Sequence, residues 1–240
     1  MKKLLVLTLA LMLGSTAQAQ WGKRVKGNGN MTTINRSVGN YDGIAIAGFF
    51  DVVLVSGKEG DLKLEGEANL LEHITTEVKN GKLTVKIEKG KNLSPSWGNN
   101  IKVTIPVSEI DEVTLSGSGD IASTTTLKAE TFKTAVSGSG DVNLSIEANS
   151  TSVTVSGSGD IALQGNTTDL EIRVSGSGDV NAFQLDTKFA KVTISGSADV
   201  SVNASVTLTA RVSGSGDVSY KGNPKKIDTK VSGSGDINKY

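Results

Sequence analysis

Apolar and polar residues alternate along most of this chain, and a short glycine-rich turn interrupts the alternation at regular intervals. The turn reads Ser-Gly-Ser-Gly-Asp in six places and Ser-Gly-Ser-Ala-Asp in one. An aliphatic residue directly precedes each turn, and another directly follows it. Because successive side chains of a strand point to opposite faces, this alternation predicts a strand on either side of each turn, with one face buried.

The seven turns form a sequence repeat, because their aspartates lie 21, 19, 19, 20, 18 and 19 residues apart. These aspartates are Asp120, Asp141, Asp160, Asp179, Asp199, Asp217 and Asp236. One repeat cannot bury its own apolar face, but stacked copies form a continuous core.

Two repeat architectures use strands of this kind. A β-propeller blade needs about 40 residues in four strands and carries aromatic motifs. A parallel β-solenoid needs one turn of chain per repeat, and each strand pairs with its equivalents about 4.8 Å above and below. The short period and an aromatic content of only 4% favour the solenoid. We therefore predict an all-β protein, a parallel β-helix with about 19 residues per rung.

The repeat is regular over residues 116–240 and loose over residues 20–115, and we expect both segments to form one continuous domain. Two weaker copies of the turn, VKGNGNM (25–31) and IAGFFDV (46–52), indicate that the first rungs begin before residue 50. The N-terminal portion is therefore expected to consist of irregular β rungs.

The segment between these copies and the first complete turn has a different texture. LEGEANLLEHI (64–74) predicts a helical turn, and the residues that follow predict a hairpin-like excursion with Trp97 at its tip. We expect this segment to cover one end of the solenoid, because uncovered strand edges promote association. Only three residues follow Ile237 at the other end, which predicts either a covering loop or an end-to-end homodimer.

The residues of the turn suit a sharp corner between strands. Glycine adopts backbone conformations with positive φ, and Ser and Asp side chains can accept hydrogen bonds from the N–H groups of such a corner. A second interpretation is a calcium column. Aspartates about 4.8 Å apart repel by about 0.9 kcal/mol in water and about 3.5 kcal/mol at an effective dielectric constant of 20, so the seven aspartates named above need solvent, N–H donors or cations. Calcium-binding β-rolls repeat every nine residues, which favours the structural interpretation.

The sequence contains few residues that are candidates for catalysis. His73 is the only histidine and lies among apolar residues, which favours a packed side chain, and the chain contains no cysteine. Nucleophilic triads and zinc sites therefore lack residues, and the repeated aspartates are equivalent, whereas acid–base catalysis needs two carboxylates in different environments. We predict no catalytic residue and no cofactor. Trp97, Phe49 and Phe50 are candidates for ligand binding through aromatic stacking, with packing in the core or cap as the alternative.

The N-terminus has the order of a secretory signal peptide over residues 1–19: Lys2 and Lys3, an apolar run from Leu4 to Leu13, and a small-residue site at Ala17-Gln18-Ala19. The apolar run is too short for a membrane span, and no other stretch is longer. Removal of two lysines changes 25 basic and 25 acidic residues to 23 and 25, a net charge of −2, which gives no electrostatic basis for nucleic-acid binding. An exported protein of the periplasm or cell surface is expected.

Several longer stretches resemble the bacterial head GIN domain family, which is labelled as auto-transporter adhesins. The likeness covers residues 25–240 and rests on IAGFFDVVLVSG (46–57), LEGEANLLEHITTEVKNGKLTVKI (64–87), IKVTIPV (101–107) and the serial SGSGD turns. The resemblance implies a right-handed parallel β-helix, export and an adhesion role, and it provides no catalytic residue.

Two hypotheses for function remain. The first is a non-enzymatic β-solenoid that binds surface polysaccharide or an envelope protein as an adhesin or scaffold. The second is a carbohydrate-active β-helix enzyme of the polysaccharide lyase or hydrolase type. Residues 88–100 are the only candidate for a cleft-forming loop in that case, with Lys89 and Lys91 as its basic residues.

Overall fold

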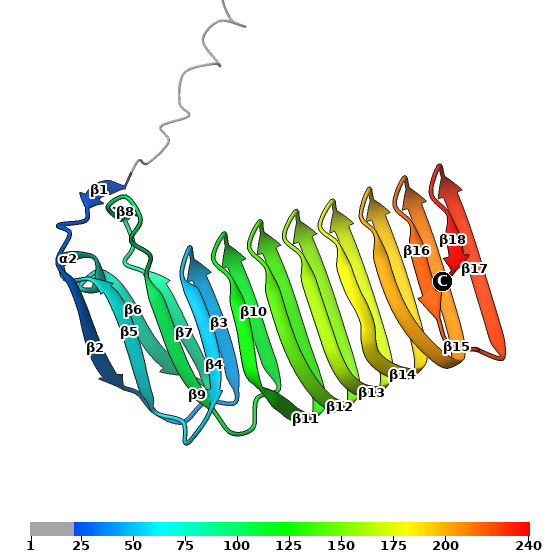
Figure 1. The fold of residues 1–240 in the computed structure, drawn as a ribbon, viewed down its shortest axis with the longest axis horizontal. Helices are drawn as coiled ribbons and strands as arrows, with labels where there is room; N and C mark the ends of the chain where they lie inside the picture. The colour runs from blue at the N-terminus through cyan, green and yellow to red at the C-terminus, as the bar shows by residue number, and fades with distance from the viewer. Residues whose placement is uncertain (1–21) are drawn as a thin grey trace, which may run out of the picture.

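Each repeat of the regular part forms a strand that bends around the solenoid. In the computed structural model, which describes residues 22–240, these strands are β10 (Glu112–Gly117), β11 (Ile121–Gly138), β12 (Val142–Gly157), β13 (Ile161–Gly176), β14 (Val180–Gly196) and β15 (Val200–Gly214). Neighbours pair in parallel one repeat apart, so that Val155 pairs with Val136 on one side and Val174 on the other. The predicted all-β solenoid with rungs of about 19 residues is confirmed (Figure 1).

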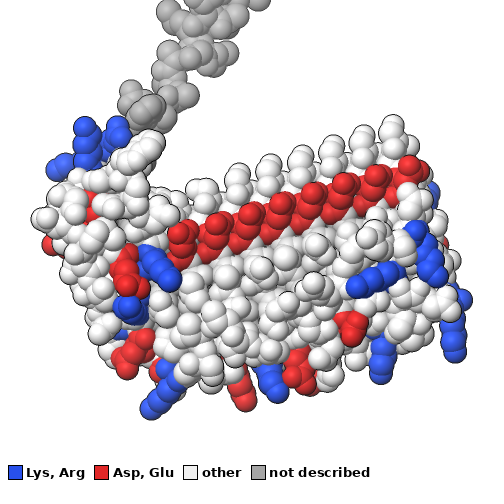
Figure 2. Space-filling model, viewed as in Figure 1, with Lys and Arg blue, Asp and Glu red and all other residues white. Residues whose placement is uncertain are grey.

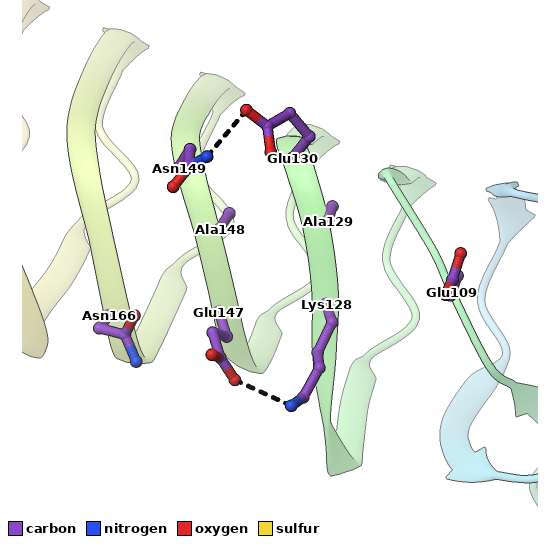
Figure 3. Close-up of a pocket in the computed structure, with 8 residues that line it drawn as sticks. All are labelled: Glu109, Lys128, Ala129, Glu130, Glu147, Ala148, Asn149 and Asn166. Atoms are coloured by element: carbon purple, nitrogen blue, oxygen red, sulfur yellow. Dashed lines mark hydrogen bonds and ion pairs between the residues drawn. The ribbon is translucent and has the colours of Figure 1, made fainter.

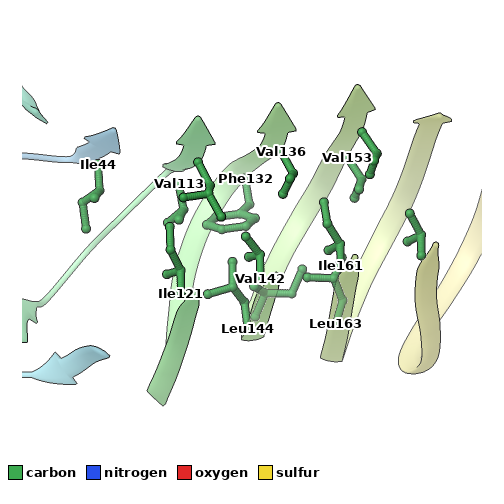
Figure 4. Packing of buried hydrophobic residues seen from close by; sticks show 14 of the residues in the cluster. Ile44, Val113, Ile121, Phe132, Val136, Val142, Leu144, Val153, Ile161 and Leu163 are labelled. Carbon is green, nitrogen blue, oxygen red and sulfur yellow. The ribbon is translucent and has the colours of Figure 1, made fainter. Parts of the chain in front are cut away.

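The two halves of a rung lie on opposite faces of the flattened solenoid. In β12 the first half buries Val142, Leu144 and Ile146, and the second half buries Val153 and Val155. Figure 4 shows such side chains from neighbouring rungs packed together between the two faces. Burial of one aliphatic side chain contributes about 1.5–3 kcal/mol, so the continuous core is the main source of stability.

The weak copy at residues 46–52 forms a rung. Its corner joins β3 (Gly43–Gly48) to β4 (Asp51–Ser56), which pair in parallel with β10 and β11. On their other side, β3 pairs with β7 (Lys82–Ile87) and β4 pairs with β9 (Lys102–Val107). The chain after β4 therefore builds the next layer toward the N-terminal end before it returns through β10.

The N-terminal end is closed by antiparallel strands and a short helix. β5 (Asp61–Glu67) runs antiparallel to both β2 (Met31–Ser37) and β9, and β6 (Ile74–Lys79) forms a hairpin with β7. The predicted helical turn is α2 (Ala68–Leu71), which buries Leu70 and Leu71. The Arg36 guanidinium donates hydrogen bonds to the carbonyl oxygens of Leu71, at 2.7 Å, and Ile74. This segment covers the core at the N-terminal end.

Two details of the N-terminal predictions are wrong. The copy at residues 25–31 is not a rung, because β1 (Lys23–Lys26) pairs with β8 (Lys91–Ser94) in a separate two-stranded sheet and the following β2 is antiparallel to its neighbour. The hairpin excursion has its tip at Asn80 and Gly81, whereas Trp97 lies in the loop from β8 to β9.

The C-terminal end differs from the N-terminal end. Here β16 (Val218–Lys221) is followed by β17 (Lys226–Gly233) and β18 (Ile237–Lys239), which pair with β15 and β16 respectively. Every residue of β17 is exposed, including the apolar Ile227 and Val231. Tyr240 packs its ring against Phe183 at 5.1 Å between centroids.

The predicted signal peptide lies outside the described residues. Within residues 22–240, no helix has both the length and the apolar character that a membrane span requires.

Candidate binding surfaces

Six of the seven corners contain two glycines, and the two have different roles. The first glycine of each turn has a positive φ, +136° at Gly157, and a Cβ there would lie 2.3 Å from the carbonyl oxygen of Gly138 in the preceding rung. The second glycine has no positive φ, although a Cβ at Gly159 would also lie close to a backbone oxygen, 2.1 Å from that of Gly140. In one turn Ala198 occupies this second place and is fully buried. The first position therefore requires glycine, and the second accepts a methyl group in at least one rung.

The aspartates of the turns form a single row along the solenoid, as the repeat predicts, and Figure 2 shows them as a red band across the rungs. The backbone N–H of each aspartate donates to Oδ1 of the aspartate one rung earlier, over 2.7–3.0 Å in all six steps from Asp120 to Asp236. These N–H donors stabilise the carboxylates and offset their mutual repulsion. The row is thus a structural part of the corner.

The geometry of this row does not suit the calcium interpretation. Calcium takes six to eight oxygen ligands around one point. Each rung contributes a single carboxylate, one oxygen of which is used by the next N–H, and no three acidic, histidine or cysteine side chains among residues 22–240 converge as metal ligands.

Two shallow grooves lie on opposite edges of the regular rungs. One, of about 470 Å³, follows the aspartate row past Asn143, Asn181 and Ser201. The other, of about 400 Å³, is lined by a Lys128–Glu147 ion pair at 3.2 Å and by Asn149, which donates to Glu130 over 2.8 Å (Figure 3). Both grooves are open, and their charged side chains are exposed, so neither has the buried, inequivalent acid–base pair of an enzyme.

The loop from β8 to β9 presents Trp97 with its whole side chain exposed, at 102% of the reference area. A turn closed by a hydrogen bond from the Asn99 N–H to the Ser96 carbonyl, 3.0 Å, and by Gly98 at φ +79° surrounds the tryptophan. Glu67, only 1% exposed, fixes this turn: its carboxylate accepts from the N–H of Ser96 at 2.8 Å and from its hydroxyl at 2.6 Å. These hydrogen bonds anchor the loop to a buried carboxylate while Trp97 projects from it into solvent.

Glu67 also ties the loop to the turn between β1 and β2. It accepts a hydrogen bond from the Gly29 N–H at 2.5 Å, and a Cβ at Gly27 would overlap its carboxylate. The Ser96 hydroxyl is the main reason that the pKa of Glu67 lies below its ordinary value, with the two backbone N–H donors adding to the effect and burial opposing it. The ionised carboxylate is thus the form that holds the two segments together.

Three exposed cations lie on β1, beside this loop. They are Lys23, Arg24 and Lys26. Arg24 donates to the Ser94 hydroxyl at 3.0 Å, and the Gly27 N–H donates to the Ser94 carbonyl at 2.9 Å, so β1 and the start of the loop are in contact. We call these three cations together with residues 95–100 the Trp97 tip; its cations form the blue group at one end of the molecule in Figure 2.

The structure separates the three aromatic candidates. Trp97 is exposed, but Phe50 is fully buried and Phe49 is half-buried against the core, with the two rings 5.6 Å apart. Phe50 occupies the corner position that the second glycine, Gly119, fills one rung later, and that position faces inward. Phe50 is thus a core residue, which corrects its assignment as a ligand-binding candidate.

The residues considered for catalysis lie near Glu88. His73 is hydrogen-bonded to Glu88 at 2.8 Å on the surface, and Lys89 and Lys91 follow it without forming an ion pair or a cleft among the described residues. Sequence analysis missed Glu67. In the sequence, Glu67 is one acidic residue between Gly66 and the apolar helical turn that begins at Ala68. A glutamate in such a place is usually exposed to solvent, so the local sequence provides no reason to expect a buried carboxylate.

Residues 40–224 match the model of the family described as putative auto-transporter adhesin, head GIN domain. The chain belongs to the head GIN domain family. No curated protein sequence matches this head GIN domain protein.

Solved structures with the same fold come from Bacteroides and Parabacteroides species. A putative adhesin from Bacteroides fragilis has a TM-score of 0.81 at 23% identity, and the match covers 90% of this chain and 100% of that one. A putative lipid binding protein from Parabacteroides distasonis has a TM-score of 0.75 at 27% identity, covering 91% and 100%. A putative adhesin from Parabacteroides merdae has a TM-score of 0.67 at 20% identity, covering 91% and 99%.

Proposed function

We propose that this head GIN domain protein is an exported, non-enzymatic, adhesin-type protein of the cell envelope whose Trp97 tip binds an acidic surface polysaccharide. The observation that carries the proposal is a fully exposed tryptophan on a loop that hydrogen bonds anchor to a buried carboxylate. Exposure of the apolar indole to water is unfavourable and does not stabilise the fold. A loop that is already ordered loses less conformational entropy when it binds a ligand.

The chemistry around Trp97 favours a sugar polymer. The indole face can stack on the apolar face of a pyranose ring. Asn28 and Asn30, both exposed, lie on the neighbouring corner and can donate and accept hydrogen bonds with hydroxyl groups. The cations of β1 add attraction for carboxylate or sulfate groups, which distinguishes an acidic from a neutral glycan.

We propose a non-enzymatic protein because of the arrangement of the aspartate row. The carboxylates from Asp120 to Asp217 all accept the same hydrogen bond from the next rung, so they do not form the inequivalent pair that acid–base catalysis needs. The family and two of the neighbours above are named as adhesins, which also supports a binding role.

An array of acidic and neutral bacterial polysaccharides tests the proposal with the purified protein. Trp97→Ala should lower the affinity for the bound acidic glycans by about tenfold, equivalent to about 1.4 kcal/mol. Phe189→Ala is the matched control, because Phe189 is an exposed aromatic residue, at 42%, on a rung far along the solenoid from the tip. Replacing the three β1 cations by alanine should weaken binding and reduce its salt dependence.

Three results would count against this function. Equal binding by Trp97→Ala and the control would remove the tip as the site. Binding of the protein to vesicles of anionic phospholipid but to no glycan would replace the sugar ligand by a lipid, in line with the name of the P. distasonis neighbour. New reducing ends or unsaturated uronate products from the bound glycan would show an enzyme instead.

A further inference from the structure

The last rung leaves inward-facing apolar positions uncovered. Ile227 and Val231 are 48% and 38% exposed, although they pair with Leu208 and Val212, which are buried. Thr229 lies between them in the same inward row, opposite the buried Ala210. The core of the solenoid therefore continues into this rung without a cover among the described residues.

The hydrogen-bonding edge of this rung is also unpaired. Among residues 22–240, β17 pairs only with β15 and β18 only with β16, as the far end of the ribbon in Figure 1 shows. A strand edge with free N–H and C=O groups beside apolar side chains is a template for another strand. The edge and the apolar row together indicate a protein surface as the partner.

We propose that the partner is a second copy of this chain, with the two β17 strands antiparallel about a two-fold axis at Thr229. An isologous interface of this kind needs a strand that is complementary to itself. β17 meets this requirement, because its inward row is apolar or small and its outward row carries both signs of charge, at Asp228 and Lys230.

Few registers of the two strands are compatible with the side chains. A shift by an odd number of residues would place inward side chains opposite outward ones, and the apolar rows would not meet. Centring the pair on Asp228 would place Lys226 opposite Lys230 and Asp228 opposite itself, and like charges directly opposite are destabilising. Centring on Lys230 would oppose that lysine to itself.

The register centred on Thr229 avoids these conflicts. It places Ile227 opposite Val231 on the inward face and Asp228 opposite Lys230 on the outward face, and the two-fold axis repeats both pairs. Arg211 donates to the Asp228 carboxylate at 2.6 Å, which fixes the aspartate for the second partner. Lysines on a strand edge often prevent pairing with another strand. In β17, Lys230 would lie opposite a lysine in each of the two other registers, but it lies opposite Asp228 in the register centred on Thr229.

The pairing would give the molecule two working ends. Because the joined ends lie opposite the capped ends, a pair would carry one Trp97 tip at each end of a rod. This consequence rests on the proposed function, whereas the pairing itself does not. A protein that binds glycan at both ends could connect two surfaces and gain avidity from repeated ligands.

Sedimentation of the purified full protein at micromolar concentration tests the pairing, with twice the monomer mass expected. Thr229→Cys gives the sharpest probe, because the chain contains no cysteine and opposite residues of antiparallel strands lie about 4.5–5.5 Å apart, within disulfide range. It should form a disulfide-linked dimer readily. Lys188→Cys, an exposed lysine on a central rung, is the control and should not.

Charge reversal tests the register. Lys230→Asp and Asp228→Lys should each lower the dimer affinity by about tenfold, and the double variant should restore it. A monomer at all concentrations, a ladder of larger masses, or equal crosslinking of the two cysteine variants would overturn the proposal. Trp97→Ala should keep the dimer mass, so failure of glycan binding and failure of pairing are told apart.

Discussion

The two ends of this solenoid differ in how the core and the last strand edge are covered. At the N-terminal end, antiparallel strands and α2 cover the core, and Leu70 is fully buried. At the C-terminal end, Ile227 occupies the same inward row as Leu208 but is 48% exposed. The comparison shows that a stack of parallel rungs needs a separate cap, because the last rung always leaves an unpaired strand edge on which another rung could form.

The capped end requires residues that the repeat does not contain. The Arg36 guanidinium satisfies carbonyl oxygens at the end of α2, and burial lowers its pKa from the ordinary arginine value without removing its charge at neutral pH. The Glu67 carboxylate accepts hydrogen bonds from the N–H groups of Ser96 in the Trp97 loop and of Gly29 in the turn after β1. Charged side chains thus replace the missing rung at this end, and the same residues hold the candidate ligand loop.

The largest expected effect comes from a corner glycine in the middle of the stack. Gly157→Ala should destabilise the protein by about 3 kcal/mol, because a positive φ and a close backbone oxygen both oppose a side chain. Gly233→Ala, the same position in the last rung, should cost about 1 kcal/mol, because this rung can move away from its only neighbour. Urea unfolding of both variants measures the difference.

Gly159→Ala serves as the control for that comparison. It changes the second glycine of the same corner, which Ala198 replaces in a later turn. A Cβ at Gly159 would lie 2.1 Å from the Gly140 carbonyl oxygen, so this variant also has a steric cost, but it lacks the positive φ of Gly157 and should therefore cost less than Gly157→Ala. Equal costs for Gly157→Ala and Gly233→Ala would mean that the end rung is as tightly held as the centre, which would contradict the view of an open end.

The regular rungs could be predicted because one pattern is written seven times. The alternation places Val155 inward, the glycines mark the corner, and the spacing stacks the aspartates without any knowledge of other contacts. Phe50 was also within reach, since its place in the corner corresponds to an inward glycine. The prediction required only that the weak copy at residues 46–52 be aligned correctly with the later turns.

The cap could not be predicted in the same way because each of its contacts occurs once. Glu67 bonds Ser96, 29 residues away, and Gly29, 38 residues away in the other direction. Neither local propensity nor a period contains such contacts. Sequence therefore identified Trp97 as a candidate but not the carboxylate and the cationic strand that define its surroundings.

A smaller effect is expected when the capped end loses its carboxylate. Glu67→Gln keeps the size of the side chain but cannot accept hydrogen bonds at both ends of its head group, so the thermal midpoint at neutral pH should fall. Because the folded pKa of Glu67 is lowered, its stabilising effect is present above the unfolded carboxyl pKa and is lost as pH falls through the folded value. The variant should therefore lose less stability than wild type on acidification.

Melting curves between neutral and acidic pH measure this difference, with Glu109→Gln as the matched control at an exposed glutamate. The control should follow wild type at every pH. Identical slopes for wild type and Glu67→Gln would show that the carboxylate does not hold the cap.

The smallest effects concern the aspartate row. Asp160→Ala removes the acceptor of the Asp179 N–H and should cost about 0.5–1 kcal/mol, reduced by relief of repulsion from the neighbouring carboxylates. Asp236→Ala should change nothing measurable, because no later rung of the described chain donates to it. Asp160→Asn keeps an acceptor without the charge and should equal or slightly exceed wild type at low salt. If Asp160→Asn instead costs as much as Asp160→Ala in urea unfolding, the charge itself stabilises the corner, and the charge-assisted hydrogen bond from the Asp179 N–H would outweigh the repulsion between neighbouring carboxylates.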